Sequence, residues 1–282
     1  MRGSGNVDYP GGLRHGDHLC WIYDDRASWR GAVTTYLLDG VKLGERLLYL
    51  GDAPMGDLSD LPGHDDLVAS GQLVAMSIDE PDRPHGRFDP GLRLDSFRRL
   101  VADAGRDGYE GLRLAADATS HLGVEPSRLL AFELMFDELV AGAPLVAMCG
   151  FAGGRISAGV ENMLCFAHPL CRRFGLDTGV HLFADGSGGW RLTGGVDLTH
   201  ATHLATALAA LPGQGDMHLR LDGLRFCDAA ATRALVAAAA RLHPAARLVL
   251  HDVPPLMRRV LSVGWPGDNP GLVVLPVRSG GA

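Results

Sequence analysis

The sequence has no apolar run that approaches the roughly 20 residues needed by a membrane-spanning helix. It also lacks an excess of positive charge, because 26 Lys and Arg residues stand against 33 Asp and Glu residues. A general nucleic-acid binder usually carries a basic face, and the net charge of −7 disfavours that class. The first residues, MRGSGNVDYPGG, contain no apolar signal core. We therefore expect a cytoplasmic protein with neither a nucleic-acid nor a membrane partner.

A phosphate-binding loop is also absent. Such a loop needs G-x-x-x-x-G-K-[ST] between a strand and a helix, so that backbone N–H groups and a lysine hold the phosphates. After the first predicted strand, His18–Tyr23, the sequence at 24–29 is DDRASW, with two carboxylates and neither glycine nor lysine. The chain also shows no nucleophile and base at a recognisable spacing. We therefore expect no ATP hydrolysis and predict that the protein is not an enzyme.

The cysteines do not form a paired pattern. Their number is odd, their positions are scattered, and none has the C-x2-C spacing of a zinc finger. In a cytoplasmic protein this distribution favours reduced thiols over a disulfide framework. The five residues are Cys20, Cys149, Cys165, Cys171 and Cys227.

Hydrophobic periodicity predicts two α/β domains in 282 residues, of which 46% are hydrophobic. Strands alternate with helices up to about residue 175, which indicates a parallel sheet covered on both faces. The pattern then changes to a hairpin, 180–184 with 190–193, followed by alternating helices and strands. No Pro- or Ser-rich linker separates the halves, so we expect them to touch. The predicted units are a flexible leader at 1–14 and domains at 15–180 and 181–282.

The second half resembles STAS domains, the fold of anti-sigma factor antagonists. The resemblance covers about 100 residues and rests on the order β-β-α-β-α-β-α-β and on the stretch 219–235, LRLDGLRFCDAAATRAL. It implies a binding module whose partner is an anti-sigma factor or another regulatory protein, met through the loop Asp228, Ala229, Ala230 and Ala231. In the family a phosphorylatable serine follows the loop aspartate, whereas Ala229 has no hydroxyl. Asp228 precedes a helix, so it is also a candidate N-cap.

The first half resembles the MEDS domain, a sensory domain named from methanogens and methylotrophs. The family is regarded as related to the RecA/KaiC-type ATPase core, which implies a mostly parallel sheet, here without a phosphate loop. Its members are proposed to sense small molecules, including hydrocarbon derivatives. The resemblance rests on residues in this order along the chain: His15, His18, Cys20 and Tyr23, then Gly44-Glu45, Gly71-Gln72-Leu73, Gly111-Leu112-Arg113, Phe132-Glu133, Cys149 and His168-Pro169.

A small-molecule pocket is the favoured interpretation of the first strand. Alternate residues of a strand share a face, so His18 and Cys20 are expected to point the same way, with Tyr23 at the carboxyl end. Parallel α/β sheets bind ligands at that end. Trp21, Ile22 and Phe151 would supply apolar walls. The complete predicted ligand-binding set is His15, His18, Cys20, Tyr23, Asp117, Glu133 and Phe151.

The same residue types leave other interpretations open. His and Cys are suitable ligands for zinc or copper, which makes His15, His18, Cys20 and His168 metal candidates. Cysteines 149, 165 and 171 could add ligands, a reactive thiol is an alternative, and buried thiols and histidines are also common as purely structural groups. Arg113 lies within an apolar strand and should pair with Asp117 or Glu133.

These observations predict a non-catalytic sensor-regulator. A MEDS-like domain would sense a small ligand or a cell state, and a STAS domain that cannot be phosphorylated would relay it by protein contact, in anti-sigma factor or partner-switching signalling. The alternatives are a metal or redox sensor that uses the His/Cys cluster, an enzyme on a RecA-like scaffold, and a structural scaffold. The sequence identifies neither the ligand nor a cofactor.

Overall fold

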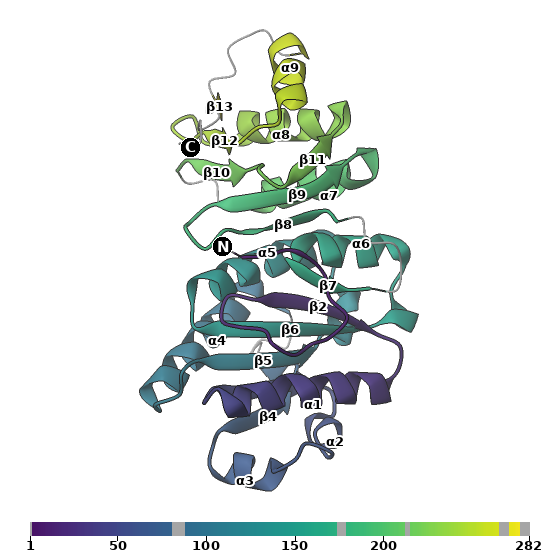
Figure 1. Cartoon of the computed structure of the whole chain (residues 1–282), viewed down its shortest axis with the longest axis vertical. Helices are drawn as coiled ribbons and strands as arrows, with labels where there is room; N and C mark the ends of the chain where they lie inside the picture. The colour runs from purple at the N-terminus through teal and green to yellow at the C-terminus, as the bar shows by residue number, and fades with distance from the viewer. Residues whose placement is uncertain (1, 81–87, 174–178, 212–214, 265–270, 277–282) are drawn as a thin grey trace, which may run out of the picture.

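The computed structural model describes residues 2–80, 88–173, 179–211, 215–264 and 271–276. Two α/β units are stacked along the long axis of the molecule (Figure 1). The predicted fold class, a mostly parallel α/β domain without a phosphate loop followed by a smaller α/β domain, is confirmed. Within the described residues, no helix has both the length and the apolar character needed to cross a membrane.

The first domain is built on a seven-stranded sheet in which all neighbouring strands are parallel. Its central strands are apolar runs that are buried on both sides, as expected for a sheet covered by helices. In spatial order the strands are β1 (Gly5–Asn6), β7 (Leu170–Arg172), β2 (His18–Tyr23), β6 (Leu145–Ala152), β5 (Leu112–Asp117), β3 (Arg46–Gly51) and β4 (Leu73–Ser77).

Helices cover both faces of this sheet. Helix α1 packs on the face that carries Trp21 and Tyr23, whereas α4, α5 and α6 pack on the face that carries Cys20 and Ile22. Side-chain caps fix the starts of the longer helices, because their oxygens accept hydrogen bonds from unpaired first-turn N–H groups. The helices are α1 (Arg26–Lys42), α2 (Pro54–Asp57), α3 (His64–Ala69), α4 (Pro90–Arg106), α5 (Pro126–Gly142) and α6 (Ala158–Ala167), with 3₁₀ turns at Thr119–Gly123 and Gly153–Arg155.

The second domain has the predicted hairpin followed by alternating helices and strands. Its sheet runs β11-β9-β10-β12-β13, and β8 pairs with β9 in antiparallel orientation. The elements are β8 (His181–Ala184), β9 (Trp190–Val196), α7 (Leu198–Ala210), β10 (Met217–Arg220), β11 (Leu224–Cys227), α8 (Ala229–Arg241), β12 (Leu248–His251), α9 (Pro255–Gly264) and β13 (Leu272–Val274). The edge strand β11 was not predicted, because Arg225 and Phe226 are both exposed and break the apolar alternation.

The segment 1–14, predicted as a flexible leader, makes ordered contacts with both domains in its described residues 2–14. Gly5–Asn6 forms β1, which extends the sheet by pairing with β7. Arg2 makes a two-pronged ion pair with the buried Asp137 of α5 and also donates to the carbonyl of Ala184 at 2.8 Å. An unpaired sheet edge and a buried carboxylate both need partners, and this segment supplies them.

The two domains pack directly against each other, as expected from the missing linker. Helices α5 and α6 lie against β8 and α7 (Figure 1), and buried residues of both domains belong to one continuous core. Asp137 accepts a hydrogen bond from the backbone N–H of Ala184 at 2.8 Å. The ring Nδ1 of His181 lies 2.9 Å from the carbonyl oxygen of Cys165 and 2.8 Å from that of His168. Polar contacts thus connect the middle of the first domain with the edge of the second.

Candidate functional site

Four buried polar side chains meet on the α5 side of the first sheet. They are His18 on β2, Glu133 on α5, Cys149 on β6 and His168 directly after α6. One ligand-type atom from each lies within 4.8 Å of the others. We call this group the His/Glu/Cys cluster. It joins three predicted site residues, His18, Glu133 and His168, with a cysteine that was predicted only as an additional ligand.

The orientation of both histidines is fixed from outside the cluster. His168 Nδ1 lies 2.8 Å from the carbonyl oxygen of Leu164, which can only accept, so Nδ1 carries the proton and Nε2 presents a lone pair. His18 Nδ1 lies 3.3 Å from Asp137 Oδ1 and is held in the same way. Burial opposes ionisation of Asp137, but hydrogen bonds from His18 and Arg2 outweigh it and keep the pKa of Asp137 below its usual value.

Burial keeps the members of the cluster uncharged near neutral pH. It lowers the pKa of His18 and of His168 and raises that of the Cys149 thiol. Burial also raises the pKa of Glu133 to about 8, with the positive charge of Arg93 opposing the shift and Asp137 reinforcing it. The contacts between the histidines and Glu133 are therefore not ion pairs.

This raised pKa predicts a pH-dependent stability in metal-free buffer. The unfolded chain loses the Glu133 proton above about pH 4.5, whereas the folded chain keeps it up to about pH 8. The stability that the protonated carboxyl gives is therefore fully present below about pH 4.5, is lost between about pH 4.5 and pH 8 at up to about 1.4 kcal/mol per pH unit, and is gone above pH 8. His18 and His168 have lowered pKa values, so their burial reduces the stability of the folded chain as the pH falls below 6.5. Urea unfolding between pH 6.5 and 8 should show a steeper decline for the wild type than for Glu133→Gln, and equal slopes would contradict the assignment.

Cys20 and His15 lie outside the cluster. Cys20 shares a face with His18, as alternation predicted, but its sulfur lies beside those of Cys165 and Cys171. These two cysteines form a disulfide, so the expectation of five reduced thiols is wrong for this pair. The turn from α6 into the unpredicted strand β7 brings their Cα atoms to 5.5 Å. Burial raises the pKa of the Cys20 thiol, which disfavours the reactive thiolate form.

His15, which is partly exposed, contacts a different network at the amino ends of the strands, on the α1 side of the sheet. Its Nε2 lies 2.9 Å from Glu45 Oε1, and Arg113 Nε donates to Glu45 Oε2 at 2.5 Å. Arg113 also donates to the carbonyl of Leu13 and stacks over the Tyr36 ring. The predicted pairing of Arg113 with Asp117 or Glu133 is wrong. The partner of Arg113 is Glu45, which lies on the adjacent turn before β3.

Tyr23 and Asp117 meet at the carboxyl ends of the strands, as predicted, but on the other side of the sheet from His18. The Tyr23 hydroxyl donates to Asp117 Oδ1 at 3.1 Å, and Arg26 bridges Asp117 and Asp57. Phe151 lies on the same side as His18 and Cys20. Trp21, Ile22 and Phe151 do not wall a single cavity, because the sheet separates Trp21 from Ile22 and Phe151.

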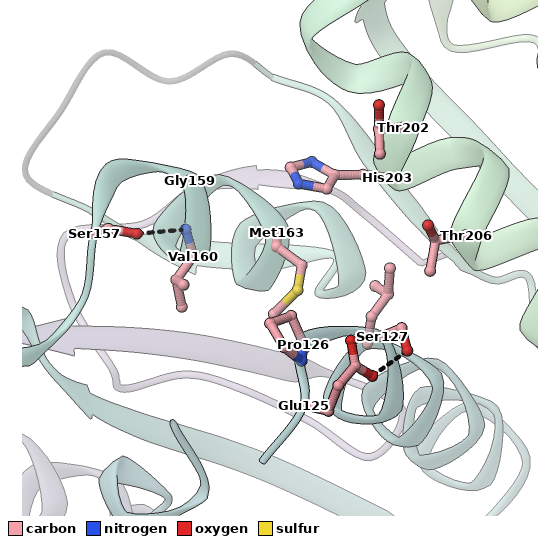
Figure 2. Close-up of a pocket in the computed structure, with 11 residues that line it drawn as sticks. Glu125, Pro126, Ser127, Ser157, Gly159, Val160, Met163, Thr202, His203 and Thr206 are labelled. Atoms are coloured by element: carbon pink, nitrogen blue, oxygen red, sulfur yellow. Dashed lines mark hydrogen bonds between the residues drawn. The ribbon is translucent and has the colours of Figure 1, made fainter. Parts of the chain in front are cut away.

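A cleft lies between the two domains. It has a volume of about 400 Å³, and its walls come from α5 and α6 on one side and from α7 on the other. Figure 2 shows His203 extending from α7 toward α6, above Met163, with Thr202 and Thr206 on the same helix. The Nδ1 atom of His203 is buried and has no hydrogen-bond partner among the described residues. Sequence reasoning missed this cleft, because its lining comes from three separate segments that carry no common motif.

The loop expected to face a partner begins the helix α8. Asp228 is the N-cap, and its carboxylate accepts a hydrogen bond from Ala231 N–H at 2.8 Å. Ala229 is exposed, whereas Thr232 is fully buried and its hydroxyl donates to the Asp228 carbonyl at 2.8 Å. The nearest hydroxyl after the loop aspartate is therefore inaccessible. Two large apolar side chains near this loop, Phe226 and Leu198, are 50% and 71% exposed.

Comparison with known families agrees with this architecture. The model described as "MEthanogen/methylotroph, DcmR Sensory domain" (MEDS) matches residues 17–169, more than half of the chain. The model described as "Mlab, STAS domain" matches residues 183–265. The protein is thus a sensory domain joined to a STAS domain. The chain belongs to the MEDS family.

Among solved structures, the chain is similar to the flagellar accessory protein FlaH from Methanocaldococcus jannaschii. Sequence identity is 13%, the match covers 65% of this chain and 80% of that chain, and the TM-score is 0.36. A likeness this distant carries no functional argument. The search of curated proteins finds no significant match.

Proposed function

We propose that this chain is a non-catalytic cytoplasmic sensor-regulator in which a small organic ligand binds in the cleft between the domains. A MEDS sensory domain joined to a STAS domain indicates a signalling or regulatory role. The observation that carries the finer proposal is that the cleft is lined jointly by the sensory helices α5 and α6 and by α7 of the STAS domain. Its volume of about 400 Å³ falls in the range of small-molecule pockets, roughly 300–1,000 Å³.

The lining suits a mainly apolar ligand with one or two polar groups. Pro126, Leu130, Val160 and Met163 supply apolar surface, and Thr202, His203 and Thr206 of α7 supply polar side chains. A ligand that touches both walls binds best to the arrangement in which they are close together. Binding therefore shifts the population toward that arrangement. The size of the shift is set by the difference between the ligand's affinities for the two arrangements.

The STAS domain would relay this change by binding an anti-sigma factor or another regulatory protein. The exposed side chains of Phe226 and Leu198 lie near the loop that begins with Asp228, and they offer apolar contact area beside it. Aromatic residues contribute strongly to protein interfaces. The exposed Ala229 and the half-buried Ala230 give the partner a surface that phosphorylation cannot change, whereas Ala231 is fully buried.

A thermal-shift screen with small organic compounds tests the proposed pocket. A ligand at 100 times its Kd stabilises the folded state by about 2.7 kcal/mol, which raises the melting temperature. The variant Val160→Trp should fill the cleft and abolish the shift, whereas Val68→Trp, at an exposed position on α3, should retain it. A shift that survives in Val160→Trp would place the ligand elsewhere.

Phosphorylation should not occur in the partner loop. Incubation with ATP and an anti-sigma-type kinase, followed by mass spectrometry, should find no phosphate at 228–232 in the wild type. The variant Ala229→Ser places a hydroxyl at an exposed position directly after the loop aspartate and serves as the positive control. Phosphate on Thr232 of the wild type would contradict the proposal, because that hydroxyl is buried and hydrogen-bonded.

ATP turnover should equal that of buffer alone. At the end of β2 the helix α1 begins after Asp24 and Asp25, and Arg26 is engaged by Asp57 and Asp117. No glycine loop presents N–H groups for phosphates there. A magnesium-dependent ATPase rate that disappears in Asp117→Asn would refute this part of the proposal.

A further inference from the structure

We propose that His18, Glu133, Cys149 and His168 form a binding site for a divalent cation of the zinc type. The inference goes beyond the proposed ligand cleft and does not rest on it. The four side chains offer two imidazole nitrogens, one carboxylate oxygen and one sulfur. All four belong to the set of groups that bind zinc in proteins, and four is the coordination number of a structural zinc site.

The spacing of the four atoms fits a tetrahedral site. Metal–ligand bonds of about 2.0–2.3 Å place neighbouring ligand atoms roughly 3.3–3.8 Å apart. Cys149 Sγ lies 3.5 Å from His18 Nε2, and Glu133 Oε2 lies 3.5 Å from His168 Nε2. Glu133 Oε2 and His18 Nε2 are 3.9 Å apart. Small adjustments of side-chain torsions would bring all four ligand atoms within bonding distance of one ion.

The histidines are held as metal-ligating histidines usually are. In such sites the second ring nitrogen donates to a carboxylate or to a backbone carbonyl, which fixes the tautomer and aims the other nitrogen at the metal. Asp137 takes this role for His18, and the carbonyl of Leu164 takes it for His168. Two different elements therefore pre-orient both Nε2 lone pairs toward the same point.

Two buried polar atoms of the cluster have no hydrogen-bond partner among the described residues, and a bound ion would coordinate both. Glu133 Oε2 and His168 Nε2 have no hydrogen-bond partner in the described part of the chain, although both side chains are almost completely buried. Leaving buried polar atoms unpaired costs free energy, roughly 1–3 kcal/mol for each neutral group. One cation would satisfy the oxygen, both ring nitrogens and the sulfur together.

The donor set selects among metals. Calcium and magnesium prefer oxygen ligands throughout, so two imidazoles and a sulfur disfavour them. Zinc accepts nitrogen, oxygen and sulfur in one tetrahedral site. Cys149 would bind as a thiolate and Glu133 as a carboxylate, so the thiol proton and any carboxyl proton pass to solvent when the ion binds. The nearby sulfurs of Cys20, Cys165 and Cys171 do not form an equivalent site here, because the disulfide takes up two of the three.

The test measures zinc and cobalt binding to the full chain. After chelation and dialysis, titration with zinc followed by mass spectrometric metal analysis should recover about one ion per chain. His168→Gln and Cys149→Ser should weaken zinc binding at least about 100-fold, beyond the 10–100-fold typical of outer-shell changes. Matched controls are His121→Gln, a buried histidine outside the cluster, and Cys227→Ser, a thiol of the second domain, and both should retain wild-type affinity.

Cobalt provides a readout that does not depend on the folding of a variant. The wild-type chain loaded with Co²⁺ should show a thiolate-to-cobalt charge-transfer band in the near ultraviolet, together with visible bands of tetrahedral intensity. A wild-type spectrum without these bands, or zinc recovery far below one ion per chain, would overturn the proposal. Equal affinity in His168→Gln and in the controls, with circular dichroism showing all variants folded, would overturn it as well.

Discussion

Replacing Asp137 with alanine should destabilise the folded chain by about 3–5 kcal/mol, the cost of breaking a buried ion pair by removing one partner. Asp137 is fully buried and joins three parts of the molecule: Arg2 near the N-terminus, His18 in the cluster and Ala184 of the second domain. Without the carboxylate, the Arg2 guanidinium loses its charge partner and the Ala184 N–H loses its acceptor. Unpaired buried groups of this kind dominate large mutational effects.

Urea unfolding at pH 7, followed by circular dichroism, measures this effect. The control is Asp95→Ala, which removes an exposed i,i+3 ion pair with Arg98 and should cost less than about 0.5 kcal/mol. The predicted loss in Asp137→Ala should be accompanied by faster proteolysis between the domains, because the contact with β8 is weakened. A loss below about 1 kcal/mol for Asp137→Ala would show that this carboxylate does not hold the domains together.

Replacing Glu45 with alanine should have a similarly large effect, about 3–5 kcal/mol, for the same physical reason. The guanidinium of Arg113 is fully buried, and Glu45 is its charge partner. The variant would leave that charge in the apolar layer beneath α1, where the Leu13 carbonyl accepts one hydrogen bond from it and the Tyr36 ring lies against it. His15, which is partly exposed and also contacts Glu45, should matter much less.

Comparison of three variants separates these contributions. Thermal and urea unfolding of Glu45→Ala, His15→Ala and the double variant Glu45→Leu/Arg113→Met should show a large loss, a small loss and a partial recovery. The recovery is expected because removing both charges leaves neither one unpaired. A double variant less stable than Glu45→Ala would indicate that the hydrogen bond and ring contact of Arg113 outweigh its need for a counter-charge.

Local patterns predicted the elements well but not the way they meet. Alternation in His18–Tyr23 correctly placed His18 and Cys20 on one face, because that face is set by the geometry of a single strand. The same rule assigns Trp21 and Tyr23 to the opposite face, so one pocket could not contain all the residues that the family motif groups together. Residues that are neighbours in the sequence motif can therefore lie on opposite faces of the sheet.

Contacts between residues far apart in the chain could not be predicted from the sequence. Arg113 pairs with Glu45 rather than with Asp117 or Glu133, and the choice depends on how the start of β3 lies beside β5. The short strands β1 and β11 were missed because an edge strand of two or four residues has little apolar pattern of its own. The cleft was missed for a related reason, since its walls are parts of helices whose joint position is set by domain packing.

The cluster and the cleft share structural elements. Helix α5 carries Glu133 of the cluster and Asp137, which holds His18, and it also contributes Leu130 to the cleft. Asp137 and the His168 carbonyl both contact β8 of the STAS domain. A change in either site would therefore act on the same interface. This common element gives the proposed sensor a direct structural route from the sensory domain to the partner-binding domain.

Hydrogen–deuterium exchange with and without a compound from the thermal-shift screen tests the central proposal most directly. If the ligand binds between the domains and favours their close arrangement, backbone amides of α5 and α6 and of β8 and α7 should become protected together. The Val160→Trp variant should show no ligand-dependent change. Protection confined to one domain, or protection that is unaltered in Val160→Trp, would contradict the account.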